Sequence, residues 1–252
     1  MVACLRPTRP RRCPGGARAP LVGAGFALAI AVVTPARADG WGGSVALASD
    51  KVFRGISQNE GRAVVFIDLN RHTDTGWSAA LGLAWPGYRQ RDDLAELTLT
   101  LGKAWQLTPD WALQLGLTHY GYIGGSGGGR YDYDELSATL GWAGRLAATL
   151  ALSPDTSGPR PGGGWRTDRA LDASLGWHER LVDRLALDVG IGYYDLKAIR
   201  GAGYGYASAG LSWGVGPLQA SLSLIASQAG RKNIVPAAAA GERWVASLVW
   251  SF

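Results

Sequence analysis

One stretch decides the fold, and it closes the sequence: Trp244-Val245-Ala246-Ser247-Leu248-Val249-Trp250-Ser251-Phe252. In an extended strand, successive side chains point to opposite faces. One face of this strand then carries three aromatic residues with Ala and Leu, and the other carries only Val and Ser. A transmembrane barrel needs a last strand that pairs with the first, because no open edge is tolerated in lipid. The stretch is typical of such a closing strand, and the alternative is an edge strand of a soluble β-sandwich.

The same alternation recurs along the chain, with turn signals between the segments. The clearest case runs from Trp77 to Trp85, where large apolar residues alternate with Ser, Ala and Gly. The pattern predicts about 12 strands, over residues 44–53, 63–70, 77–85, 96–101, 111–118, 135–142, 146–153, 171–177, 185–193, 207–213, 218–224 and 244–252.

The connections between these segments decide the topology. Tight connections, as at 108–110 and 143–145, alternate with longer ones, as at 123–130 and 228–242. Outer-membrane barrels have short periplasmic turns and longer external loops, whereas a soluble sandwich has no reason to alternate in this way. The sequence therefore predicts an all-β fold, a transmembrane antiparallel up-and-down β-barrel of about 12 strands. Both termini are expected on the periplasmic side.

The first 38 residues have the features of a secretory signal peptide. Five arginines and no acidic residue precede position 20, an apolar run covers 21–33, and Ala36-Arg37-Ala38 supplies small residues for cleavage before Asp39. The apolar run is too short to span a bilayer as a helix. We therefore predict a signal peptide at 1–38, an outer-membrane β-barrel at 39–252, and a location in the cell outer membrane.

Removing this segment changes the charge balance and the cysteine count. The whole sequence has 25 basic and 20 acidic residues, and residues 1–38 contain six of the basic ones, so 19 minus 20 leaves a net charge of −1. A nucleic-acid partner is not expected for such a chain. Both cysteines, Cys4 and Cys13, also lie in the removed segment. Disulfides, thiolate metal sites and a cysteine nucleophile are therefore excluded for the mature chain.

One motif carries a family resemblance. The segment Ser49-Asp50-Lys51-Val52-Phe53-Arg54-Gly55-Ile56-Ser57-Gln58 resembles the N-terminal signature of the TorF-like porin family, although an aromatic residue often stands at the position of Lys51. Residues 76–88 match the family only loosely. The resemblance implies a channel without naming a solute.

Strand parity places several charged residues inside the barrel. Asp50 and Arg54 share a face but lie four residues apart on an extended strand, about 13 Å, so they cannot pair directly. Arg54 is expected either to pin the first external loop through ion pairs or to form a charged constriction. Acidic rings select cations, so a mild cation preference is expected. The candidate pore-lining residues are Asp50, Arg54, Asp68, Glu96, Glu135, Asp172 and Asp188.

The sequence offers no arrangement for catalysis. A serine nucleophile needs a histidine base within hydrogen-bond distance, and none of His72, His119 and His178 has a serine that close on the same strand face. No cluster of residues has metal-ligand spacing. We therefore expect a porin-like channel for passive diffusion of small hydrophilic solutes, not an enzyme and without a cofactor. The alternatives are an outer-membrane lipid hydrolase and a structural or adhesive barrel plugged by its loops. The expected partners are outer-membrane lipid, small solutes, and the barrel-assembly machinery acting through the C-terminal strand.

Overall fold

The computed structural model describes residues 39–85, 95–124, 129–159 and 163–252. The predicted signal peptide, 1–38, lies outside the described residues and stays a prediction. Within the described part of the chain, no helix has the length and apolar character needed to cross a membrane.

The described residues form one closed antiparallel barrel, so the predicted all-β barrel fold is confirmed. Each wall strand pairs with its neighbours along the chain, and β1 closes the ring against β14, with Val45 opposite Trp250. The wall strands are β1 (Gly40–Ala48), β4 (Val64–His72), β5 (Trp77–Trp85), β6 (Ala95–Gln106), β7 (Trp111–Ile123), β8 (Tyr133–Trp142), β9 (Leu146–Pro159), β10 (Trp165–Val182), β11 (Leu185–Asp195), β12 (Tyr204–Val215), β13 (Leu218–Ser227) and β14 (Arg243–Ser251).

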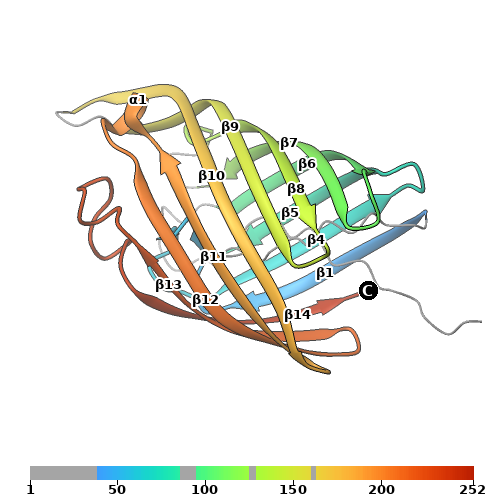
Figure 1. The fold of residues 1–252 in the computed structure, drawn as a ribbon. Helices are drawn as coiled ribbons and strands as arrows, with labels where there is room; N and C mark the ends of the chain where they lie inside the picture. Colours follow the sequence, from blue (N-terminus) through green and yellow to red (C-terminus); the bar gives the residue numbers. More distant parts are fainter. Residues whose placement is uncertain (1–38, 86–94, 125–128, 160–162) are drawn as a thin grey trace, which may run out of the picture.

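The two ends of the barrel differ in their connections, as the loop lengths predict. Figure 1 shows the last residue and the tight turns at one end of the barrel, and the helix α1 (Lys197–Arg200) with longer connections at the other. By the usual architecture of such barrels, the end with tight turns is the periplasmic end and the other is the external end.

The outer surface carries a band of apolar side chains. Outward leucines of neighbouring strands are exposed, and Leu150 reaches 59%. The inward neighbours on the same strands are buried or half-buried. Such an alternation places the exposed face in lipid hydrocarbon.

A tryptophan girdle borders this band at the periplasmic end. Trp111 and Trp142 lie at the periplasmic ends of β7 and β8 with ring centroids 6.4 Å apart, and Trp177 continues the row 6.5 Å from Trp142. Aromatic rings of this kind anchor barrels at the membrane–water interface. Other exposed tryptophans near this end are Trp41, Trp77, Trp105, Trp213 and Trp250.

The lumen is not uniform along its axis. In the periplasmic half, the inward positions of neighbouring strands hold Ser, Thr, Gly, Ala and a few larger polar residues, as at Thr139 and Thr149, whose hydroxyls lie 2.9 Å apart. In the external half, inward tyrosines such as Tyr120, Tyr133 and Tyr204 are buried. The cross-section is therefore filled mainly near the external end.

Several predicted boundaries are wrong. The strands expected over 146–153 and 171–177 are longer, because β9 continues to Pro159 and β10 runs from Trp165 to Val182. The first strand was expected over 44–53, but β1 ends at Ala48, and the chain then turns into the barrel. The connection 196–203 contains the short helix α1.

Candidate functional site: the inner loop and its cation cage

The loop after β1 folds into the lumen, and we call residues 49–63 the inner loop. It contains a small hairpin of two strands, β2 (Val52–Phe53) and β3 (Ile56–Ser57). The side chains of Lys51 and Arg54 reach β6, β8 and β10, the backbone at Gly55 lies against β12 and β13, and Ile56 bridges to Ala240 in the connection before β14. A single loop thus contacts most of the circumference of the external half of the lumen.

The hairpin turn is made by Arg54 and Gly55, which both adopt positive φ, 49° and 77°. Two consecutive positive φ values are the geometry of the tight hairpin turn that favours Asn-Gly. Gly55 is also required by space, since a Cβ there would lie 2.7 Å from the Cβ of Tyr206 and 2.8 Å from that of Ser227. The hairpin tip is therefore pressed against β12 and β13.

The side chain of Arg54 lies in what we call the cation cage, formed by Glu135 of β8, Asp172 of β10 and Tyr194 of β11. Arg54 Nη2 donates to Glu135 Oε2 at 2.6 Å, and Arg54 Nε lies 3.3 Å from Asp172 Oδ1. The guanidinium carbon lies 4.4 Å from the Tyr194 ring centroid and 4.5 Å from that of Phe53. Two carboxylates and two aromatic faces thus surround one cation.

The cage keeps Arg54 charged although its side chain is only 8% exposed. Burial would lower the pKa of Arg54, but Tyr194, Glu135, Asp172 and Tyr133 together raise it well above its ordinary value. One nitrogen, Nη1, is nevertheless buried without a hydrogen-bond partner among the described residues. The cage therefore binds the Arg54 guanidinium through Nη2 and Nε but gives Nη1 no acceptor.

A second buried ion pair fixes the start of the inner loop. Lys51 Nζ lies 2.8 Å from Glu96 Oε2 on β6, and both side chains are almost fully buried. Burial lowers the pKa of Lys51, and the charge of Glu96 offsets part of this effect. The backbone nitrogen of Lys51 also donates to Asn59 Oδ1 at 2.9 Å, which closes the loop on itself.

A third ion pair ties the inner loop to the last strand. Arg243 Nη1, at the start of β14, donates to Asp50 Oδ2 at 2.8 Å. Ser57 Oγ donates to Asp50 Oδ1 at 2.7 Å, so Asp50 joins both sides of the hairpin to β14.

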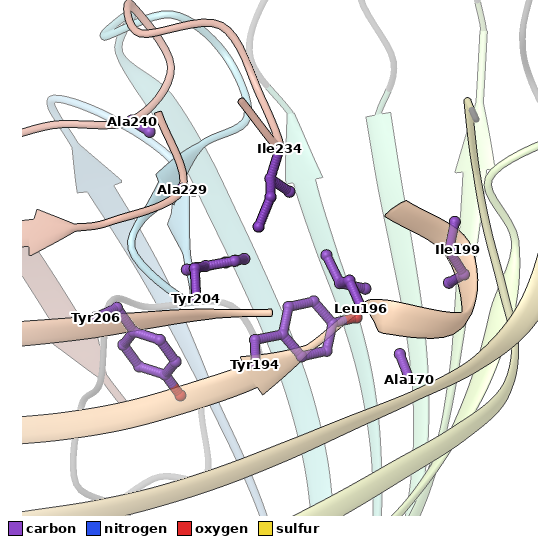
Figure 2. Packing of buried hydrophobic residues seen from close by; sticks show 9 residues of the cluster. All are labelled: Ala170, Tyr194, Leu196, Ile199, Tyr204, Tyr206, Ala229, Ile234 and Ala240. Atoms are coloured by element: carbon purple, nitrogen blue, oxygen red, sulfur yellow. The ribbon is translucent and has the colours of Figure 1, made fainter. Parts of the chain in front are cut away.

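An apolar and aromatic cluster packs behind the cage at the external end. Figure 2 shows Tyr194 of β11 and Tyr204 of β12 beside Leu196 and Ile234 of the external connections, while the ring of Tyr206, also on β12, points away from Ile234. Tyr206 Oη donates to Asp172 Oδ1 at 2.8 Å and so orients one carboxylate of the cage. The partly buried Ile56 packs against this cluster.

The structure brings together five of the seven sequence-predicted residues. Arg54, Glu135 and Asp172 meet in the cage, while Asp50 and Glu96 bind the two other cations of the site. All five lie inside the external half, but their role as pore lining stays a prediction.

Asp68 and Asp188 lie apart from the inner loop. Asp68, in the middle of β4, accepts a hydrogen bond from Asn70 Nδ2 at 2.8 Å. Asp188, near the periplasmic end of β11, accepts from Ser212 Oγ at 2.7 Å, and His178 Nδ1 lies 2.7 Å from its other oxygen. Neither carboxylate has a Lys or Arg partner in the ion pairs of the described residues.

The His178 group does not have the order of a nucleophilic triad. Ser212 and His178 both bond to Asp188, whereas a serine nucleophile must bond to the histidine that takes its proton. Across the described ranges, no group of three or more His, Asp or Glu side chains is arranged to hold a metal ion. The expectation that the chain is not an enzyme and has no cofactor stays a prediction.

Sequence reasoning missed Lys51, Tyr194 and Tyr206 as members of this site. A signal for the hairpin was present, because Val52-Phe53 and Ile56-Ser57 flank a two-residue turn that contains Gly. The tyrosines gave no comparable signal, since inward aromatic residues also fill lumens without binding anything.

No protein-family model matches the sequence, and a search of curated proteins found no match. Among solved structures, the fold is similar to a NanC porin, with TM-score 0.58, 10% sequence identity, and coverage of 84% of this chain and 99% of that one. A KdgM porin matches with TM-score 0.53, 6% identity and the same coverages. KdgM in complex with disordered oligogalacturonate gives TM-score 0.52, again at 6% identity, 84% and 99%. The chain therefore has the closed-barrel fold of outer-membrane porins.

Proposed function

We propose that this protein is an outer-membrane channel for the passive diffusion of small hydrophilic solutes, narrowed at its external end by the inner loop. The observation that carries the proposal is the contrast between the two halves of the lumen. Small and polar inward residues line the periplasmic half, and small side chains leave space for water in a barrel of twelve strands. The hairpin and its ion pairs occupy the external half, where a constriction would select solutes.

The porin fold supports the proposal, and the lumen chemistry limits the solutes. One similar porin was solved in complex with an oligogalacturonate, which is an acidic oligosaccharide. In this chain, the six inward carboxylates outnumber the three cations, Lys51, Arg54 and Arg243, that pair with them. An acidic solute would meet charge of its own sign, so neutral and cationic solutes are favoured.

We further propose membership in the TorF-like porin family. The segment that resembles the family signature, residues 49–58, is the segment that builds the hairpin of the inner loop. The proposed partners follow from the surfaces: lipid against the exposed leucine band, and the barrel-assembly machinery at β14.

Planar-bilayer recording of residues 39–252 tests the channel. We expect discrete ion-conducting steps. Replacing residues 51–58 by a short Gly-Ser linker should raise the single-channel conductance and admit larger sugars in a liposome-swelling assay, because the hairpin occupies part of the cross-section.

The proposal is overturned if neither the unaltered barrel nor the linker variant conducts ions in the bilayer while heat-modifiable migration in gels shows that both are folded. The protein would then be a structural barrel. Cleavage of phospholipid or lipid A by the purified protein would point instead to the hydrolase.

A further inference from the structure

We infer that the cation cage of Glu135, Asp172 and Tyr194 is a binding site for guanidinium-bearing solutes, and that Arg54 of the inner loop occupies it as a built-in competitor. A solute that enters the cage would displace Arg54 and free the hairpin tip. The inference names the solute class of the proposed channel and so rests on that function, but the binding itself can be measured without any ion current.

The cage belongs to the wall and stays when the hairpin tip leaves. Its three side chains project from β8, β10 and β11, and Tyr206 of β12 orients Asp172 through a 2.8 Å hydrogen bond. A planar guanidinium fits such a site, because it can donate to two carboxylates while its face lies on an aromatic ring. Arg54 shows this arrangement directly, with a 2.6 Å bond to Glu135 and 4.4 Å to the Tyr194 ring.

Arg54 fills the cage imperfectly, and this favours exchange. Its Nη1 is buried without an acceptor among the described residues. Its backbone has φ of 49°, a conformation that residues other than glycine rarely adopt and that surrounding contacts must maintain. A free guanidinium carries no such backbone constraint and can rotate to satisfy its donors.

The hairpin tip can move once Arg54 is released. Beyond its ion pairs, its backbone contacts outside the inner loop are few: Ser57 N donates to Ala239 O at 2.9 Å, and Ile56 bridges to Ala240. A two-stranded hairpin is only marginally stable alone. The Lys51–Glu96 and Asp50–Arg243 pairs and the packing of Val52 against Ile225 and Val245 keep the rest of the inner loop in place. The occupancy of the cage therefore controls the position of the hairpin tip around Arg54 and Ile56.

Chemical rescue of Arg54→Ala tests the binding site. Methylguanidinium should raise the midpoint of the heat-modifiability transition of this variant by at least about 2 °C relative to NaCl of the same ionic strength, because a ligand that binds only the folded state stabilises it. Urea, a neutral molecule of similar planar shape, should give no shift at the same concentration. The double variant Arg54→Ala/Glu135→Gln should lose the rescue, since the stronger hydrogen-bond partner is then uncharged.

A second measurement uses the unaltered cage and does not depend on the folding of Arg54→Ala. Residues 39–252 contain no cysteine, so Ile56→Cys gives a single thiol on the half-buried hairpin. Methylguanidinium should speed its reaction with a maleimide severalfold, and urea should not. The control is Ser221→Cys, an inward position near the periplasmic end whose hydroxyl contacts Ser247 and not the inner loop.

The outcomes separate this inference from the channel proposal. Equal effects of methylguanidinium, NaCl and urea in both assays would overturn the cation site, even if the barrel conducts. Selective rescue and faster labelling in a barrel that never conducts would establish the site and refute the channel.

Discussion

Arg54 is constrained at once by its charge, by its burial and by its backbone conformation. Its position in a tight turn is unfavourable for a side chain, and its guanidinium needs partners because the surroundings exclude water. Removing one partner of a buried ion pair typically costs about 3–5 kcal/mol, because the other charge is left without compensation. The conformation of the inner loop and the charges of the wall are therefore coupled through this one residue.

The alternation of side chains makes opposite predictions for neighbouring residues of β9. Leu150 is exposed on the outer face, whereas the hydroxyl of Thr149 lies 2.9 Å from that of Thr139 inside the lumen. Arg on the lipid face at the bilayer midplane costs about 2–4 kcal/mol, while lumen substitutions mainly alter selectivity. Leu150→Arg should therefore lower the free energy of unfolding in lipid vesicles by about that amount, and Thr149→Arg by much less. Urea titration followed by tryptophan fluorescence measures both, and equal losses would show that the faces are wrongly assigned.

Among the wall elements, β14 has the most demanding position. It closes the ring against β1, and beyond its last residue Phe252 exchanges two backbone hydrogen bonds with Gly43, each of 3.0 Å. The Phe252 ring lies 5.1 Å from that of Trp250, within the aromatic girdle. The junction of β14 with β1 thus combines backbone hydrogen bonds with an aromatic anchor at the membrane interface.

Phe252→Asp should leave secretion intact but reduce insertion into the outer membrane, because a charged group replaces an exposed aromatic anchor at the interface. Fractionation and heat-modifiable gel migration measure the inserted share. Phe252→Trp, which keeps an aromatic ring, is the matched control and should insert normally. Normal insertion of the Asp variant would show that the anchor is dispensable.

The elements also show what sequence alone could predict. The strand at 77–85 was predicted to the residue, because tryptophans bound a strict alternation and the turn-forming residues Pro86 and Gly87 come next in the sequence. The strand at 44–53 was predicted too long, because no Gly or Pro interrupts that segment. The chain leaves the wall there because Asp50 and Lys51 find partners at Arg243 and Glu96, far away in sequence. The local sequence pattern cannot predict contacts between residues that lie so far apart in the sequence.

At the scale of the whole molecule, the balance of charge in the lumen determines ion preference. Glu135 and Asp172 share the single cation Arg54, and Asp68 and Asp188 have no Lys or Arg partner in the ion pairs of the described residues, so the inward carboxylates are only partly compensated. Parity predicted the carboxylates, and ion pairs of Arg54 were one of two expectations for that residue, but the partners Glu135 and Asp172 were not predictable because the loop was expected outside the lumen.

The channel should therefore prefer cations, with a reversal potential of the corresponding sign across a salt gradient. Asp188→Asn should weaken the preference, because Asp188 has no Lys or Arg partner in the ion pairs of the described residues. Asp134→Asn is the matched control, since Asp134 is exposed on the outer face beside His119. The preference should fade near 1 M salt, where the Debye length is about 3 Å. Anion preference of the unaltered protein would contradict this charge balance.

The attachment of the inner loop also has a consequence for the order of folding. The loop follows the first wall strand, yet Arg54 bonds to a residue 81 positions later and Asp50 to one 193 positions later. Contacts between such distant residues form late, because the chain between them must be ordered first. The inner loop can therefore dock only when β14 has arrived, so resistance of residues 49–63 to protease should be the last native property that the refolding chain acquires.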